Sequence, residues 1–143
     1  MRFVALEVFR KFALDDVLEK FEKYVDEFNV KSIKDCDVDE MKNAIIALSE
    51  RKPYVKVYPD RIRVYNSFSI KDELKRRGFS FNSFEKCWEK RVKKLLENEN
   101  YLKIHSVKID EVEELKKMNV PVLSPADWRR LESFFTKVSM GGI

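Results

Sequence analysis

The spacing of apolar residues predicts two helices in the first third of the chain. Between residues 14 and 28 apolar side chains recur every three or four positions, which places them along one side of a helix. A second helix is predicted from Asp37, because its carboxylate can accept a backbone N–H at the helix start while Glu40, three positions later, completes a capping box. Residues 3–12 fit either an extension of the first helix or a short strand.

From Tyr54 onwards the apolar period changes from about 3.6 to 2. Residues 54–65 therefore predict an antiparallel hairpin with one apolar side. Ser69 is expected to cap a short helix over residues 70–77, which Gly78 would end in the left-handed conformation. A second hairpin over residues 79–92 completes a ββαββ unit.

The C-terminal part carries weaker signals. Residues 102–107, which include His105, alternate as a possible fifth strand. A helix is expected from Asp110 through Met118, followed by Asn119 as the residue after its end. Another helix should begin where an N-cap, a proline and an acidic residue come together at Ser124, Pro125 and Asp127.

These elements predict an α+β fold, with an antiparallel sheet of four to five strands around a ββαββ core and helices packed on one face. We expect a single domain over residues 1–143, since 143 residues is an ordinary domain length. Within it, residues 1–50 form a helical part, residues 51–93 a basic ββαββ unit, and residues 94–143 a C-terminal strand and helices.

Composition excludes several classes of protein. With 44% hydrophobic and 38% charged residues and only 3 glycines, the chain is neither disordered nor fibrous. Its apolar runs are too short to span a membrane, and a cytoplasmic location is expected. The 2 cysteines and 1 histidine cannot form a structural zinc site. The high combined content of Lys, Glu and Phe, with no Gln, resembles the archaeal style of hyperthermophile composition.

The positive charge is concentrated in the middle of the chain. Residues 51–93 carry 13 basic and 5 acidic side chains, a net charge of +8, whereas residues 1–50 have a net charge of −4 and residues 94–143 a net charge of 0. A positive stretch within one structural unit attracts polyanions. Nucleic acid is therefore the leading class of partner.

Aromatic and basic residues alternate on the outward side of the first predicted hairpin. Because side chains of one parity share a side of a sheet, one side should carry Tyr54, Lys56, Tyr58, Arg61, Arg63 and Tyr65. Rings on which bases stack, next to cations that follow phosphates, are typical of single-strand binding. The alternative is a solvated side on which tyrosine favours the strand conformation and the cations protect an edge.

The second hairpin adds further rings and cations to this candidate site. Phe79 and Phe81 share a parity and fit ordinary core packing, whereas Phe84 and Trp88 are better candidates for the wall of a cleft. For Trp88 a core position stays open as the alternative. The cations of this region that we include in the site are Arg76, Arg77, Lys86, Lys90 and Arg91.

Part of this region resembles known nucleic-acid-binding modules. The run from Ser69 to Phe81, closed by Lys86-Cys87-Trp88, looks like the pattern K-x-x-L-K-x-x-G-(aromatic-x-aromatic)-x(5-6)-W of HARP-like modules. Together with the predicted sheet, the chain is also similar to the archaeal Thermo-DBP group and its related proteins. This resemblance implies sequence-tolerant single-strand binding, with bases entering an apolar cleft over the sheet and homo-oligomerisation through helices.

The sequence contains no convincing catalytic motif. Asp60 followed by Glu73-Leu74-Lys75 formally matches a metal-dependent nuclease pattern, but a hairpin tip and a helix surface do not obviously converge on one cation. His105 has no obvious acidic partner for nucleophilic catalysis. We therefore expect no enzyme activity, no catalytic residue, no metal and no cofactor.

Two functions of different classes remain. The first is sequence-tolerant binding of single-stranded DNA or RNA by a cytoplasmic homo-oligomer, a dimer or tetramer, without a membrane partner. The second is a protein-interaction or assembly module in which Trp128, Phe134 and Phe135 dock a partner and the basic side is only solvated. DNA and RNA are not distinguished, because contacts to the 2′-OH leave no local motif.

Overall fold

The first third of the chain is helical. In the computed structural model, which describes residues 2–33, 36–58, 60–91 and 110–142, this part forms α1 (Arg2–Lys11), α2 (Leu14–Glu27) and α3 (Val38–Glu50), with a 3-10 turn, η1 (Val30–Ser32), after α2. Residues 3–12 are thus helix rather than strand. The apolar stripe predicted for α2 is buried at Val17, Phe21 and Val25.

The start of α3 connects three distant parts of the chain. As predicted, the Asp37 carboxylate accepts the backbone N–H of Glu40, with 3.0 Å between the nitrogen and Oδ1. The reciprocal half of the capping box does not form, because the Glu40 carboxylate instead accepts from the backbone N–H of Val122 at 3.4 Å. The backbone N–H of Asp37 is bound by Asp127 Oδ2 at 3.1 Å.

The five strands described form one mixed sheet. They are β1 (Tyr54–Val57), β2 (Arg61–Tyr65), β3 (Ser80–Asn82), β4 (Cys87–Arg91) and β5 (Val122–Leu123), in the order β3-β4-β2-β1-β5. All neighbours are antiparallel except β5, which runs parallel to β1. The α+β class and the strand number are confirmed, but the sheet is not purely antiparallel.

The link between the two hairpins holds a short helix. A 3-10 turn, η2 (Phe68–Ile70), leads directly into α4 (Lys71–Arg76), and Gly78 ends it with φ of +89°. The left-handed glycine was predicted. The capping role of Ser69 was wrong, because Ser69 lies inside η2 and no side chain caps α4.

The C-terminal elements complete the sheet. After α5 (Asp110–Lys117), β5 leads into α6 (Pro125–Ser139), whose first turn is capped as predicted by Ser124, with 3.2 Å between its Oγ and the backbone nitrogen of Asp127. The fifth strand is therefore β5. The strand predicted at residues 102–107, with His105, lies outside the described residues.

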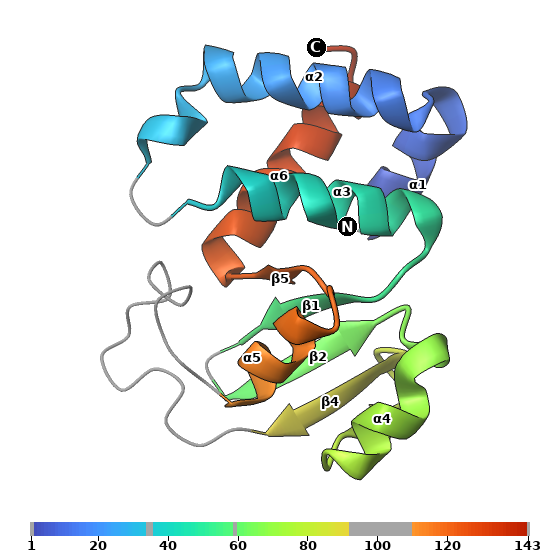
Figure 1. Cartoon of the computed structure of the whole chain (residues 1–143). Coiled ribbons are helices and arrows are strands. Elements are labelled where there is room, and N and C mark those ends of the chain that lie inside the picture. The colour runs from blue at the N-terminus through green and yellow to red at the C-terminus, as the bar shows by residue number, and fades with distance from the viewer. Residues whose placement is uncertain (1, 34–35, 59, 92–109, 143) are drawn as a thin grey trace.

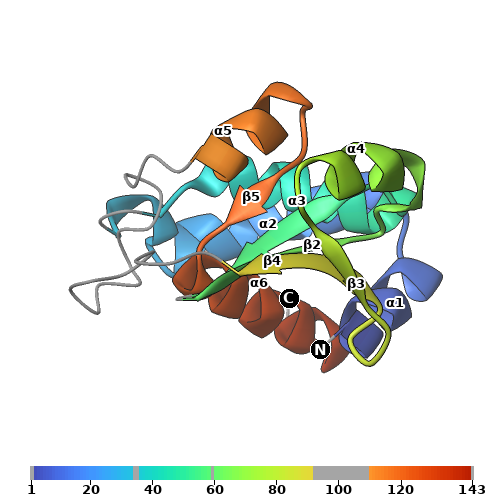
Figure 2. The same ribbon diagram turned by 90° about the horizontal axis from the view of Figure 1, so that it is seen from below.

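Helices cover both sides of the sheet, which corrects the expectation of one covered face. Figure 2 shows α4 and α5 on one side and α6 on the other. The smaller core, on the α4–α5 side, contains Val55, Ile62 and Leu115, while the larger core joins α1, α2, α3 and α6 to Tyr54 and its neighbours on the opposite side. Figure 1 shows α2 and α3 stacked above the sheet. Among the described residues, no helix has the length and apolarity needed to cross a bilayer.

Candidate nucleic-acid interface

The side of the sheet that carries the alternating tyrosines and cations is not open. We call Tyr54, Lys56, Tyr58, Arg61, Arg63 and Tyr65 the tyrosine face. The register confirms that they share one side, since Tyr54 pairs with Tyr65 and Lys56 with Arg63. However, Tyr54 and Tyr65 are only 2% and 6% exposed.

The cause of this burial is α6. The indole of Trp128 stacks on the ring of Tyr54 with 5.3 Å between centroids and 10° between planes, and Tyr65 stacks on Tyr54 at 5.4 Å. Burial also raises the pKa of the Tyr65 hydroxyl. The prediction that Tyr54 and Tyr65 are open to stack on bases is therefore wrong, because a later helix covers them.

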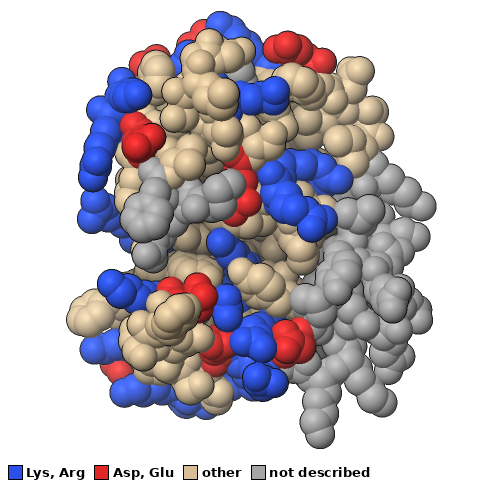
Figure 3. All heavy atoms as spheres, turned by 180° about the vertical axis from the view of Figure 1, so that it is seen from behind, with Lys and Arg blue, Asp and Glu red and all other residues tan. Residues whose placement is uncertain are grey.

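At Arg61 and Arg63, the cations of the tyrosine face are paired with acidic residues that the alternation along its two strands did not predict. β4 places Glu89 between the two arginines, with 3.5 Å from its Oε2 to Arg61 Nη1 and 3.8 Å to Arg63 Nε. Asp60 binds Arg61 as well, and this hydrogen bond lowers the pKa of the Asp60 carboxyl. In Figure 3, which looks from the side of α6, basic and acidic side chains lie intermixed over the sheet.

The remaining cations of the tyrosine face lie against aromatic rings. The Lys56 ammonium is 4.3 Å from the ring centroid of Trp128 and 5.1 Å from that of Tyr65. The Arg63 guanidinium lies 4.9 Å from the centroid of Tyr58. Such cation–π contacts stabilise the fold by about 0.5–2 kcal/mol each. The cations of this face therefore contribute to the stability of the protein.

The predicted site is divided between the two sides of the sheet. In the register of β4, Trp88 is opposite Val64 and Lys90 is opposite Ile62, so both lie on the α4–α5 side, away from the tyrosines. Arg91 is opposite Arg61, on the tyrosine side, and is exposed. The sequence could not show this, because the pairing of β2 with β4 sets the parity.

Three of the predicted cations on the α4–α5 side have partners within the fold. Arg77 binds Glu73 at 2.9 Å and Glu114 at 3.3 Å, which joins α4 to α5. Arg76 binds Glu73 at 2.7 Å but is 74% exposed. The Lys90 ammonium donates to the carbonyl of Arg77 at 2.8 Å, at the C-terminal end of α4 where a cation is favoured.

A different set of rings and lysines, exposed or half-buried, lies on η2, α4 and the β3–β4 hairpin. We call this set the α4–hairpin surface; it consists of Phe68, Lys71, Lys75, Phe81, Phe84, Lys86 and Trp88. The rings of Phe68, Phe81 and Phe84 are 79%, 54% and 91% exposed. Within the part of the chain that the structure describes, no ion pair involves its three lysines.

Lysines and rings alternate along this surface. The Lys71 ammonium lies 4.2 Å from the ring centroid of Phe68, and the Lys75 ammonium lies 5.7 Å from that of Trp88. Trp88 in turn meets Phe81 edge to face at 5.6 Å. Because Lys71 and Lys75 are four positions apart on a helix, they share one side of α4 and align these contacts in a row.

The tip of the β3–β4 hairpin carries a further exposed ring and a further exposed lysine. The side chain of Asn82 orders the turn, since its Oδ1 accepts the backbone N–H groups of Phe84 and Glu85 at 3.0 Å each. Phe84 and Lys86 project from the ordered turn, both exposed. Trp88 is half-buried and contacts the smaller core, so it is neither wholly core nor an open cleft wall.

Sequence reasoning missed four residues of this surface. Phe81 was expected in the core beside Phe79, but only Phe79 is buried, because α4 ends before it can cover Phe81. Phe68, Lys71 and Lys75 were not selected. The signal was available in the spacing of four between the two lysines, with a ring three positions before the first.

The alternative docking site at the C-terminal helix is not open either. Phe134 and Phe135 are 0% and 3% exposed and belong to the larger core, and Trp128 contacts both Tyr54 and Lys56. Phe134 and Phe135 are therefore not accessible to a partner, whereas Trp128 is half-buried. The nuclease pattern does not converge, since Asp60 binds Arg61 while Glu73 binds Arg76 and Arg77.

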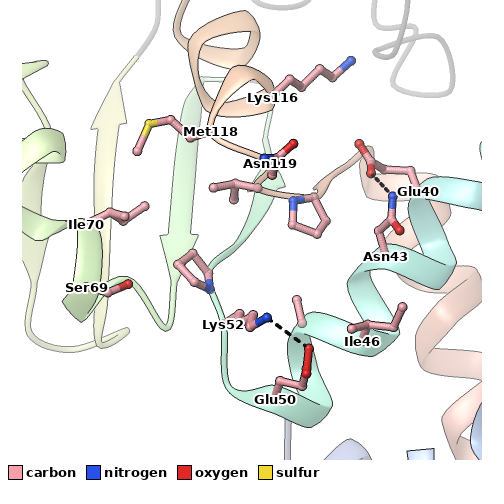
Figure 4. A pocket seen from close by; sticks show the side chains of 14 residues that line it. Glu40, Asn43, Ile46, Glu50, Lys52, Ser69, Ile70, Lys116, Met118 and Asn119 are labelled. Atoms are coloured by element: carbon pink, nitrogen blue, oxygen red, sulfur yellow. Dashed lines mark hydrogen bonds and ion pairs between the residues drawn. The ribbon is translucent and has the colours of Figure 1, made fainter. Parts of the chain in front are cut away.

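A large open pocket lies between α3, η2 and the segment that joins α5 to β5 (Figure 4). Its volume is about 790 Å³. Figure 4 shows Glu40 bound to Asn43 and Lys52 bound to Glu50 along its α3 wall, with Lys116 on the opposite side. Since side chains of both signs line it, the pocket selects no single ligand charge.

Comparison of the chain with protein-family models, with curated proteins and with solved structures gave no match in any of the three. The resemblance to HARP-like modules and to the Thermo-DBP group therefore stays a prediction, as do the homo-oligomer and the cytoplasmic location.

Proposed function

We propose that the chain binds single-stranded nucleic acid, DNA or RNA, through the α4–hairpin surface and without strong sequence preference. The observation that carries this proposal is the exposure of Phe68, Phe81 and Phe84 on η2 and the β3–β4 hairpin, together with two lysines of α4 that have no acidic partner among the described residues. A group of large apolar rings left exposed on one part of a surface indicates a contact surface.

The chemistry of the row fits a single strand. Every base has a flat face that stacks on an aromatic ring whatever its sequence, and this contributes about 1–3 kcal/mol per base. Lys71 and Lys75 lie beside the rings, where they can follow the phosphates. A duplex offers no free base face to these rings, so single strands should be preferred.

The first test is a titration of a fluorescein-labelled oligo-dT, oligo-rU and a duplex of equal phosphate number, followed by anisotropy. We expect single strands to bind more tightly than the duplex. We also expect log Kd to rise with log salt concentration, by about 0.7 per phosphate neutralised. No binding of any single strand at low salt would overturn the proposal and favour a protein partner for the exposed rings.

The second test locates the site. Phe81→Ala should weaken single-strand binding about ten-fold, which corresponds to the loss of roughly 1.4 kcal/mol of stacking. Phe28→Ala is the matched control, because Phe28 is also exposed, at 45%, and contacts a lysine, Lys137 at 4.8 Å, but lies at the C-terminal end of α2. Equal losses in both variants would contradict the assignment.

Trp88 gives a direct optical readout. In a Trp128→Phe background, emission comes from Trp88 alone, and a stacked base should quench it. The background substitution breaks no hydrogen bond within the described residues, since the buried Nε1 of Trp128 has no partner there. Emission unchanged at saturating oligo-dT would show that the strand binds elsewhere.

A further inference from the structure

A second, smaller pocket lies on the α6 side of the sheet, next to β1 and the junction between β5 and α6. Figure 1 shows where β5 leads into α6. Its volume is about 330 Å³, near the lower end of the range for small-molecule sites. The rings of Tyr58, Pro125 and Trp128 contribute to its lining. The walls are thus flat and mostly apolar.

The charged groups that line this pocket are both positive among the residues that the structure describes. Lys56 and Arg129 line it, and no carboxylate of the described residues does. Lys56 is fixed in place by its contacts with the rings of Trp128 and Tyr65. Arg129 is exposed at the first turn of α6 and makes no ion pair among the described residues, which leaves its guanidinium able to bind a carboxylate or phosphate in a bidentate manner.

The nearest acid on α6 does not cancel this charge. Asp127 is fully buried, and its carboxylate is bound by Arg130 Nη1 at 2.6 Å and by the backbone N–H of Asp37 at 3.1 Å. A cationic pocket with apolar walls favours a ligand that offers both an apolar body and a negative charge.

We infer that this pocket binds a small, flat organic anion, with the aromatic body against Trp128 and Tyr58 and the anionic group between Lys56 and Arg129. The site is separate from the α4–hairpin surface and does not depend on the proposed function. An aromatic carboxylate and a nucleoside monophosphate share this chemistry, and the test distinguishes them.

The test uses the full chain with Trp88→Phe, so that emission reports Trp128 in the pocket wall. The probes are 1-naphthoate, AMP and the neutral 1-naphthalenemethanol. We expect 1-naphthoate to change Trp128 emission and to bind about ten-fold more tightly than the alcohol. AMP binding at the same site would assign it to nucleotides, and binding of naphthoate alone would assign it to carboxylates; both outcomes support an anion site.

Substitutions at Lys56 and Arg129 test whether these two residues bind the anionic group. Lys56→Met and Arg129→Gln should each weaken naphthoate binding about ten-fold. Lys137→Met is the matched control, because its ammonium also lies over a ring, that of Phe28, but at the other end of α6. Circular dichroism verifies that each variant is folded. Equal binding of the alcohol and the anion, unchanged binding in Lys56→Met and Arg129→Gln, or no binding of either anion would overturn the inference.

Discussion

At the scale of single residues, the environment of a ring decides its role. Tyr54 and Phe84 are both aromatic residues in or beside a hairpin of the basic segment, yet Tyr54 is 2% and Phe84 91% exposed. Tyr54 lies between Trp128 and Tyr65, and its removal would leave both of these rings without a stacking partner. Phe84 contributes nothing comparable to the core.

We therefore predict that Tyr54→Ala lowers the free energy of unfolding by about 3–5 kcal/mol, as for other large aromatic residues removed from a core. Phe84→Ala should change it by less than about 0.5 kcal/mol. Urea denaturation followed by circular dichroism measures both. A small effect at Tyr54 would show that α6 does not cover the tyrosine face.

The two cysteines make the stability of the fold depend on pH. Burial raises the pKa of the Cys36 and Cys87 thiols from an ordinary 9.0 to about 11. Between these values the unfolded chain loses the thiol protons while the folded chain keeps them, so the stabilisation present below pH 9 is lost as the pH rises towards 11.

The expected consequence is an alkaline decline of Tm that depends on these thiols. The variant with Cys36→Ala and Cys87→Ala should show a shallower decline between pH 9 and 11 than the original chain, because the contribution of the two thiols is removed. Thermal unfolding at several pH values measures the difference. Parallel curves would mean that the thiols ionise normally in the fold.

At the scale of elements, Asp127 joins the starts of two helices. It lies in the first turn of α6, is fully buried, and binds both Arg130 and the backbone N–H that precedes α3. Removal of one member of a buried charged network leaves the others without a partner, which costs about 3–5 kcal/mol.

Asp127→Ala should accordingly destabilise the fold by about 3–5 kcal/mol in urea denaturation. Asp39→Ala serves as the control, since Asp39 is likewise in the first turn of a helix but exposed; there the loss should be below about 1 kcal/mol. Similar losses for the two would show that the network around Asp127 adds nothing to a simple interaction with the helix dipole.

The sequence predicts an element well when the interactions that form it lie within a few residues, and poorly when they join distant segments. Asp37, Gly78 and Ser124 act within a few residues of themselves, and their helix starts or ends were predicted correctly. β5 has two residues and exists because β1 offers it an edge, so no local pattern indicates it. The covering of Tyr54 by Trp128 is likewise a contact between distant segments.

The candidate site shows the same limit. Counting charged residues correctly identified residues 51–93 as basic. The alternation of side chains along β1 and β2 correctly placed the residues of the tyrosine face on one side of the sheet. Parity within one hairpin could not show that β4 would bring Glu89 to that face and place Trp88 on the other, because the pairing of β2 with β4 determines both. The exposure of Phe81 depended on where α4 ends.

At the scale of the whole molecule, the sheet lies between two cores. Leu115 belongs to the smaller core and Phe134 to the larger one, and both are 0% exposed. Adjacent residues of the same strands contribute to opposite cores, as Tyr54 and Val55 do in β1. Loss of either core should therefore remove the support of the sheet for the other.

We predict one cooperative transition. Leu115→Ala and Phe134→Ala should each lower the free energy of unfolding by about 2–5 kcal/mol and therefore lower the urea midpoint. In each variant the two sides of the sheet should still unfold together. Trp88 and Trp128 lie on opposite sides of the sheet, so single-tryptophan variants report each side separately. Two midpoints in either variant would show that the cores unfold independently.

The parallel pairing of β5 with β1 has a consequence for synthesis on the ribosome. The hairpin of β1 and β2 emerges long before residues 122–139, which supply the neighbouring strand and the helix that covers Tyr54. During that interval the nascent hairpin carries an unpaired edge and uncovered rings, a state that invites aggregation. We expect the growing chain to be a chaperone client until α6 has left the exit tunnel.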